Sequence, residues 1–234
     1  MDDGLRQLEE RIGELLAERS SWKVLEAGCG SASHIGFKNG TTIVGIDISP
    51  KQLDLNSLLT EKIVGDLETY PLPPETFDLV VCWDVLEHLP NPRKALENFF
   101  VTVNRGGIII LASPNVLTLR GLITKWSPHW FHVFYARYIA GYDWAGMPEG
   151  YPFPTYHRFA IAPAAIARLA KERSIDVVSA KTYGFDHPEQ QHKIFYALWR
   201  LADTIASIVS LGTLKTDKHA AFCIILQKPA SPHR

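Results

Sequence analysis

The stretch WKVLEAGCGSASHIGFKNGTTIVGID, residues 22–47, decides the fold of this chain. It holds two short apolar runs, Trp22–Ala27 and Thr42–Asp47, with a glycine-containing loop after the first. Apolar runs of this length bounded by glycine are typical of buried strands, and the glycines let the backbone turn tightly. Because ligands bind where the strands of an open α/β sheet end, the loop at Gly28 and Gly30 is a predicted binding site.

Strands and helices are expected to alternate along most of the chain. We expect helices over 3–19, 33–38, 50–59, 92–103, 163–173 and 194–214. We expect further strands over 62–64, 77–82, 108–112, 175–180 and 220–226. Strands that are apolar throughout and alternate with helices predict a parallel sheet covered on both faces. The expected fold class is therefore α/β, doubly wound and Rossmann-like, interrupted after residue 115 by an aromatic, proline-punctuated segment.

Length and charge limit the classes to which this protein can belong. At 234 residues the chain is long enough for one sizeable core, and we interpret residues 1–234 as a single domain. Within it we expect a leading helix over 1–20, a cofactor-binding half over 21–115, insertions over 116–160 and 187–214, and a loose tail over 229–234. The net charge of −1 creates no positive electrostatic field that would attract a polyanion, which argues against nucleic acid as a partner.

The cysteines and the N-terminal residues indicate a cellular compartment. Cys29, Cys82 and Cys223 are far apart in the sequence and form no CxxC pair, which favours reduced thiols. The N-terminal residues are acidic and amphipathic, unlike a signal or transit peptide. We therefore expect a cytoplasmic protein.

Two carboxylates indicate which ligand the glycine loop binds. Asp47 ends the second strand, where a carboxylate can accept hydrogen bonds from both hydroxyls of a ribose. The dinucleotide fingerprint G-x-G-x-x-G requires a glycine where this chain has Ser33. Glu26 would repel a pyrophosphate, whereas it attracts the sulfonium and ammonium groups of S-adenosylmethionine. The residues therefore favour S-adenosylmethionine over NAD, and the alternative is a tight turn that binds no ligand.

Four stretches carry a family resemblance: VLEAGCGSAS, VGIDIS, VGDLETYPLPPETFDLVVCWDVLEHLPNP and RGGIIILASPN. They resemble successive motifs of the class I S-adenosylmethionine-dependent methyltransferases, of the small-molecule type. The resemblance implies a seven-stranded sheet whose last strand is antiparallel, and S-adenosylhomocysteine as the product. It also implies cofactor-binding roles for Glu26, Gly28, Cys29, Gly30, Asp47, Ile48, Asp66, Leu67 and Trp83.

Asp84, Glu87 and His88 form a second cluster, directly after the expected fourth strand. Spaced three and four residues apart, they share one face of a helical turn. The spacing resembles the acidic-x-x-Glu-His motif of ubiquinone-biosynthesis O-methyltransferases and of small-RNA end methyltransferases, where it belongs to a divalent-metal site. Here an aspartate replaces the first glutamate, so three interpretations stay open: a catalytic base at His88 supported by Glu87, a metal site, or a structural role. His157 is either a loop or cap residue, or a catalytic residue across the pocket from His88.

The second half of the chain carries a large surplus of apolar residues. Residues 126–159 hold 12 of the 25 aromatic residues, which indicates an apolar cavity, an interface or an accessory core. The expected helix over 194–214 is largely apolar, and its only charged residues, Arg200 and Asp203, disfavour a membrane span. We expect both segments to form a lid with outward-facing charges, and to contact a second subunit or a membrane surface.

The predicted function is S-adenosylmethionine-dependent O-methylation of a hydrophobic small molecule or a lipid-like acceptor. Two alternatives remain at this stage. The first is an enzyme that keeps the cofactor but catalyses a cyclisation or a dehydration. The second is a binding protein without turnover, which the retention of Glu26, Asp47 and Asp66 disfavours.

Overall fold

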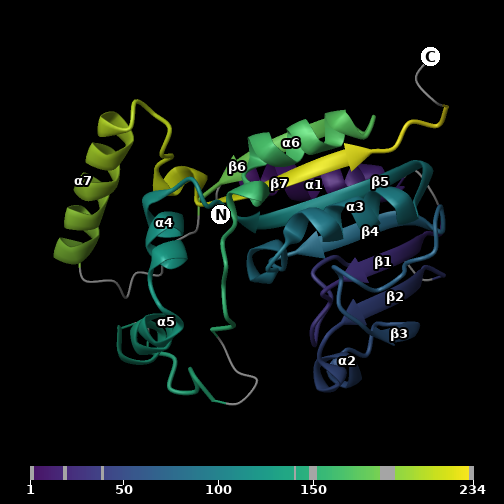
Figure 1. The fold of residues 1–234 in the computed structure, drawn as a ribbon, viewed down its shortest axis with the longest axis horizontal. Helices are drawn as coiled ribbons and strands as arrows, with labels where there is room; N and C mark the ends of the chain where they lie inside the picture. Colours follow the sequence, from purple (N-terminus) through teal and green to yellow (C-terminus); the bar gives the residue numbers. More distant parts are fainter. Residues whose placement is uncertain are drawn as a thin grey trace.

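The computed structural model describes residues 3–17, 20–37, 40–139, 141–147, 152–184 and 193–231. Within these residues, seven strands form one sheet in the order β3-β2-β1-β4-β5-β7-β6 (Figure 1). The strands are β1 Lys23–Ala27, β2 Thr42–Asp47, β3 Glu61–Val64, β4 Phe77–Trp83, β5 Val103–Pro114, β6 Asp176–Tyr183 and β7 Ala221–Gln227. The pairs from β3 to β5 are parallel, whereas β7 runs antiparallel to both β5 and β6. The predicted fold class and the antiparallel last strand are confirmed.

Helices and short helical turns connect the strands. The helices are α1 Asp3–Ala17, α2 Pro50–Leu55, α3 Pro92–Thr102, α4 Leu119–Trp126, α5 His129–Phe134, α6 Pro163–Glu172 and α7 Lys193–Val209. The turns are η1 Leu86–His88, the π-helical η2 Tyr135–Ile139, η3 Phe159–Ile161 and η4 Asp217–His219. The order of the strands reverses between β1 and β4, which in sheets of this kind is where ligands bind.

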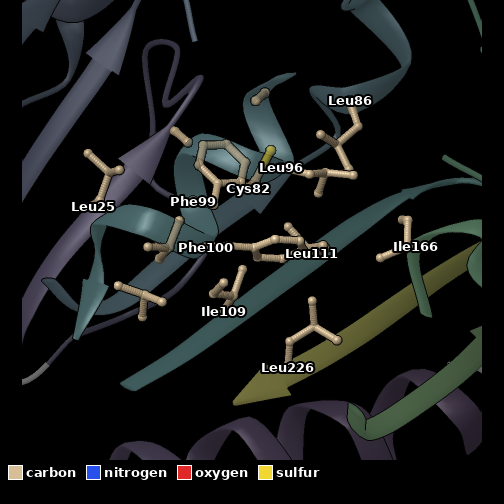
Figure 2. Packing of buried hydrophobic residues seen from close by; sticks show 14 of the residues in the cluster. Leu25, Cys82, Leu86, Leu96, Phe99, Phe100, Ile109, Leu111, Ile166 and Leu226 are labelled. Carbon is tan, nitrogen blue, oxygen red and sulfur yellow. The ribbon is translucent and has the colours of Figure 1, made fainter. Parts of the chain in front are cut away.

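The core lies on both faces of the sheet because successive strand residues point in opposite directions. Cys82 of β4 belongs to one hydrophobic cluster with Phe99 of α3 and Ile166 of α6, as Figure 2 shows. The neighbouring Val81 belongs to a second cluster on the other face, together with Leu15 of α1. Burying a side chain of this size contributes about 1.5–3 kcal/mol, so the two clusters supply most of the stabilising energy.

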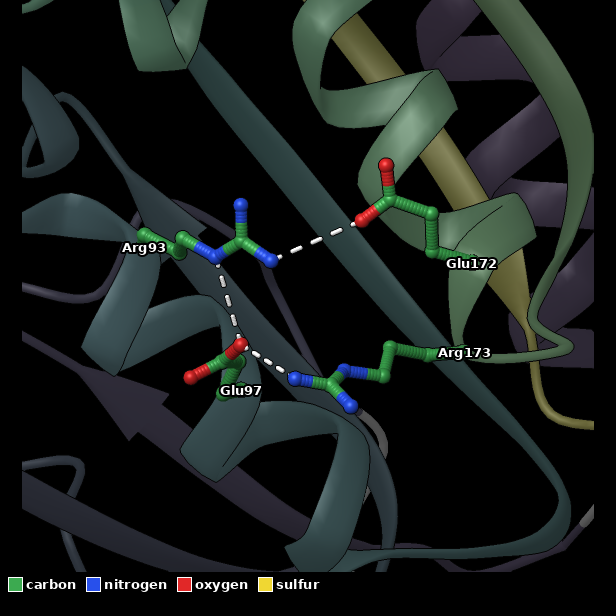
Figure 3. Close-up of polar contacts among 4 residues, drawn as sticks. All are labelled: Arg93, Glu97, Glu172 and Arg173. Carbon is green, nitrogen blue, oxygen red and sulfur yellow. Dashed lines mark hydrogen bonds and ion pairs between the residues drawn. The ribbon is translucent and has the colours of Figure 1, made fainter.

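A surface ion-pair network joins α3 to α6 over the first cluster (Figure 3). The carboxylate of Glu97 accepts from Arg173 at 2.6 Å and from Arg93 at 3.3 Å. Arg93 also contacts Glu172 at 3.5 Å. Because these side chains are largely exposed, each pair is worth about 1 kcal/mol or less, and the apolar contacts beneath them hold the two helices.

One expected helix and several expected boundaries were wrong; the helix expected over 194–214, for example, ends at Val209 as α7. Residues 33–37 form no helix, because the Ser33 hydroxyl bonds to Glu26 instead of capping a helical turn. Helix α2 ends at Leu55 rather than at residue 59, because the buried Asn56 accepts from the backbone N–H of Leu58 and turns the chain. Strand β5 starts at Val103, five residues earlier than expected, and its pairing with β4 is irregular in this part.

Helix α7 lies at one end of the molecule with α4 and α5, beside the ends of the parallel strands (Figure 1). Its stripe of Leu198, Leu201 and Ile205 is exposed, whereas Asp203 is buried. The expectation that the charges of this helix face outward is therefore wrong for Asp203, although Arg200 is exposed. None of the helices in the described part of the chain has the length and apolar character needed to cross a membrane.

Candidate functional site

The loop after β1 is shaped by two glycines with positive φ. At Gly28, with φ of +71°, an added Cβ would lie 2.5 Å from a methyl carbon of Val85, so only glycine lets the loops after β1 and β4 pack together. At Gly30, with φ of +52°, an added Cβ would meet no atom within 4 Å. The backbone of Gly30 therefore borders open space that a ligand can approach.

Glu26 is a buried carboxylate at the end of β1. The Ser33 hydroxyl and the backbone N–H of His34 both donate to it, and burial raises its pKa. A cation bound beside this group would replace part of its lost hydration. The thiol of Cys29 is buried against Gly45, and burial raises its pKa to about 12. Cys29 can therefore offer a ligand only its backbone groups.

Asp47 and Ile48 lie at the end of β2. The carboxylate of Asp47 can accept hydrogen bonds from a pair of hydroxyl groups, and the side chain of Ile48 offers an apolar surface beside it. Asp47 Oδ2 accepts from the N–H of Gly30 at 3.0 Å, and Oδ1 accepts from that of Ser49 at 2.8 Å. Each carboxylate oxygen has a second lone pair, so ribose hydroxyls can still donate to it. The Ile48 side chain is 75% exposed directly beside this carboxylate, which suits contact with the flat face of a base.

Asp66 and Leu67 follow β3, whose register pairs Val64 with Asp47. Asp66 is exposed, and its Oδ1 accepts from the N–H of Glu68 at 2.8 Å, which fixes the direction of the turn. The Leu67 side chain is part of the core, so this residue can offer a ligand only its backbone. These two predicted cofactor-binding residues therefore follow the strand next to Asp47; Asp66 can offer a ligand its side chain, and Leu67 only its backbone.

Trp83 forms an aromatic wall with a residue that the sequence analysis missed. Its ring stacks on that of His34, with centroids 5.9 Å apart and an interplanar angle of 13°. His34 comes from the loop after β1, and Trp83 ends β4. Nothing in the sequence pattern marked His34, because the pairing depends on how the two loops fold.

The chemistry of these residues fits S-adenosylmethionine. The carboxylate of Glu26 matches the charged methionyl part, the acceptor oxygens of Asp47 match the ribose hydroxyls, and the apolar side chain of Ile48 matches the adenine. The open space at Gly30 gives the ligand access to the loop between these groups.

Asp84, Glu87 and His88 differ sharply in environment. Asp84 is exposed and has a φ of +53°, a strained conformation for a residue other than glycine. Glu87 is 4% exposed, and Ser113 of β5 donates to its Oε2 at 2.9 Å. Burial, and then the nearby charge of Asp84, raise the pKa of Glu87 to about 8. Glu87 is therefore mostly protonated at neutral pH.

His88 has a defined tautomer. Its Nδ1 lies 2.8 Å from the carbonyl oxygen of Pro154, and because a carbonyl only accepts, we assign the proton to Nδ1. The lone pair is then on Nε2, which lies 3.9 Å from Glu87 Oε1. Burial lowers the pKa of His88, so the ring is neutral at neutral pH and can accept a proton at Nε2.

His157 is buried next to the same turn. Its backbone N–H donates to the carbonyl oxygen of Glu87 at 3.1 Å, and its φ is +43°. Burial lowers its pKa to about 4, and its Nδ1 has no hydrogen-bond partner within the described residues. It is not a helix cap, because α6 begins at Pro163 with Ala162 as the N-cap. The structure thus brings His157 and His88 together on Glu87.

No group of three histidine, cysteine, aspartate or glutamate side chains in the described residues is arranged to hold a metal ion. The carboxylate of Glu87 accepts a hydrogen bond from Ser113, and Asp84 lies on the exposed side of the turn.

An open pocket of about 510 Å³ is lined in part by two residues that contact His88. Its wall includes Phe153 and Pro154, and the ring of Phe153 meets that of His88 edge to face at 6.0 Å. The other lining residues are mostly apolar and come from α5 and the segment after it: His129, Trp130, Val133, Gly146, Met147 and Pro152. The volume is within the range of small-molecule sites.

Comparisons with known proteins place this site in a family. Residues 25–111 match the family described as a methyltransferase domain. The chain is 32% identical over 124 residues to the 18S rRNA (guanine-N(7))-methyltransferase bud23 of Schizosaccharomyces pombe, covering 45% of this chain and 46% of that protein. It is 32% identical over 126 residues to the mitochondrial ubiquinone biosynthesis O-methyltransferase of the same yeast, covering 47% and 46%. The chain thus spans about half the length of these curated relatives.

The fold is similar over nearly the whole chain to a solved structure. A SAM-dependent methyltransferase from Archaeoglobus fulgidus matches with a TM-score of 0.57 and 15% identity, over 95% of this chain and 94% of that one. At this identity the likeness supports the fold alone. The matched domain over residues 25–111, together with the cofactor motifs and the strand order, supports a class I S-adenosylmethionine-dependent methyltransferase.

Proposed function

We propose that this protein transfers the methyl group of S-adenosylmethionine to a hydroxyl oxygen of a hydrophobic small molecule or lipid-like acceptor. The observation that carries this proposal is the neutral ring of His88, held by Pro154 with Nε2 free to accept a proton. A hydroxyl is a weak nucleophile until a base accepts its proton, so a neutral histidine beside the acceptor pocket suits O-methylation.

The roles of the chain's own residues follow from their environments. Glu26, Asp47 and Ile48 hold the cofactor, which supplies a methyl group bound to a positively charged sulfur. His88 takes the hydroxyl proton at Nε2 as the acceptor oxygen gains the methyl group, and S-adenosylhomocysteine is the other product. Glu87 acts as a positioning residue, because its carbonyl oxygen accepts from the backbone N–H groups of both Tyr156 and His157.

The lining of the pocket supports an apolar acceptor. Trp130, Val133, Met147 and Phe153 offer rings and aliphatic groups to the pocket, and none of its lining residues in the described part of the chain is a carboxylate or a lysine. The two curated relatives act, by their names, on a ribosomal RNA and in ubiquinone synthesis, so the shared domain leaves the acceptor open. A cytoplasmic location belongs to the same proposal, supported by three buried free thiols.

A methyl-transfer screen tests the proposal. The purified protein and labelled S-adenosylmethionine are incubated with phenols, quinols, fatty acids and polyprenyl lipids, and product mass distinguishes methylation from cyclisation or dehydration. With an acceptor found, His88→Ala should lower turnover by about 10²–10⁴-fold and leave cofactor affinity unchanged.

His219→Ala is the matched control, because His219 lies in η4 and contacts Thr182 rather than the pocket. Because the pKa of His88 is lowered, activity should persist to lower pH than an ordinary histidine base allows. Full turnover in His88→Ala would refute its role as the base.

A further inference from the structure

Most of the exposed apolar side chains lie at one end of the molecule. Of the 25 large apolar residues with exposed side chains in the described part of the chain, 15 lie within 123–147 and 198–211. These exposed side chains, from α4, α5, η2, the turn after η2, and α7, form what we call the end surface, and Figure 1 shows the three helices together at that end. Soluble monomers rarely leave an apolar area of this size uncovered, so it indicates an interaction site.

Helix α7 is fixed with its polar side inward. Asp203 Oδ2 accepts from the backbone N–H of Asp217 at 2.9 Å, and the indole N–H of Trp199 donates to the Asp217 carboxylate. The Arg120 guanidinium of α4 lies 3.3 Å from the same carboxylate and 5.4 Å from the centre of the Trp199 ring. These contacts leave an aliphatic stripe facing away from the protein, made of Leu198, Leu201, Ile205, Ile208, Val209 and Leu211.

The end surface also has an excess of positive charge. Segments 119–147 and 193–219 hold seven lysines and arginines and three acidic residues, a formal charge of +4 in a chain whose total is −1. Two of the three acidic residues, Asp203 and Asp217, are buried, and Asp143 is exposed. Arg137, Arg200 and Lys218 are exposed and belong to the same segments as the aliphatic stripe and the exposed aromatic rings.

One class of partner fits the aliphatic, aromatic and basic side chains of the end surface best. Aliphatic side chains bury into acyl chains, tryptophan and tyrosine prefer the headgroup level, and lysine and arginine attract anionic lipids. In a two-fold dimer the surface would face itself and place like charges together. A nucleic acid would pair with the basic and aromatic groups but leave the aliphatic stripe uncovered.

We propose that the end surface docks in the plane of an anionic lipid bilayer, with α7 and the aromatic residues of α4 and α5 in the headgroup region. The pocket beside His88 shares His129 and Trp130 with α5, so it lies next to this surface. If the proposed function holds, an acceptor dissolved in the bilayer reaches the pocket from this side.

Vesicle flotation tests the docking without cofactor or acceptor, so its outcome is independent of the proposed function. The protein should float with vesicles of phosphatidylcholine and phosphatidylglycerol, float less with phosphatidylcholine alone, and detach as sodium chloride rises. Leu201→Glu should weaken partitioning by about tenfold or more. Arg137→Gln should weaken it by about fivefold.

Val101→Glu is the matched control, because Val101 is an exposed apolar residue of α3, outside the end surface. It should float as the unsubstituted protein does. Since Leu201 and Val101 are both exposed, neither change disturbs the core, and equal melting temperatures will show this.

Three results would overturn the proposal. The first is absence of the unsubstituted protein from both kinds of vesicle. The second is a dimer, seen by light scattering, that Leu201→Glu dissociates; it would assign the end surface to a second copy of the chain. The third is tight binding of a single-stranded RNA that competes with the vesicles, which would assign it to nucleic acid.

Discussion

Replacement of Glu87 by glutamine should change how the stability of the protein depends on pH. Burial raises the pKa of Glu87 from 4.5 to about 8 in the folded state, whereas the unfolded chain keeps the ordinary value. Between these two values the folded state holds a proton that the unfolded state has released. The stabilisation that this proton contributes is therefore fully present below about pH 4.5 and is lost as pH rises towards 8.

The size of the effect follows from the same two values. Each unit of pKa difference corresponds to about 1.4 kcal/mol, so the free energy of unfolding should fall by several kcal/mol, on the order of 3–6, across this window. Glutamine has the shape of the protonated acid and cannot ionise. The Glu87→Gln variant should therefore lack this fall and gain stability relative to the unsubstituted protein as pH increases.

Chemical denaturation at several pH values between 5 and 8 measures the difference. The control is Glu97→Gln, because Glu97 is an exposed carboxylate whose pKa is lowered chiefly by Arg173. Removal of this carboxylate should lower the free energy of unfolding only slightly, and should leave the dependence of that free energy on pH in this window unchanged. Parallel pH profiles for the unsubstituted protein and Glu87→Gln would refute the inference that Glu87 is protonated when buried.

Three further predictions concern the cofactor loop. Gly28→Ala should lower the free energy of unfolding by about 1–3 kcal/mol, because its Cβ would meet Val85 and its φ is positive, whereas Gly30→Ala should cost less, as thermal melting will show. Asp47→Ala should weaken S-adenosylmethionine binding by roughly 1.5–3 kcal/mol in calorimetry, where NAD should show no binding, and unchanged affinity would contradict the ribose assignment. Because burial raises the pKa of Glu26, cofactor affinity should fall on acidification at a higher pH than for an ordinary glutamate, and Glu26→Gln should flatten that dependence.

The sequence by itself determined the sheet and the cofactor half of the site. Strand patterns such as Phe77–Trp83 are local, and the groups predicted to meet the cofactor lie where neighbouring strands end, so chain order places them together. The prediction that Glu26 and Asp47 bind the cofactor could therefore be made from their spacing. The expected helix over 33–38 was wrong because a side-chain bond to Glu26, formed only in the folded loop, replaced it.

Only the tertiary structure decided the acceptor half of the site and the direction that α7 faces. The tautomer of His88 depends on Pro154, which is 66 residues away in the sequence. The contact between Asp203 and Asp217 sets which side of α7 faces inward, and the pattern of residues along the helix does not predict this contact. An amphipathic pattern shows that a helix has two faces, and tertiary contacts select the face that is buried; here the polar face is buried and the apolar face is exposed.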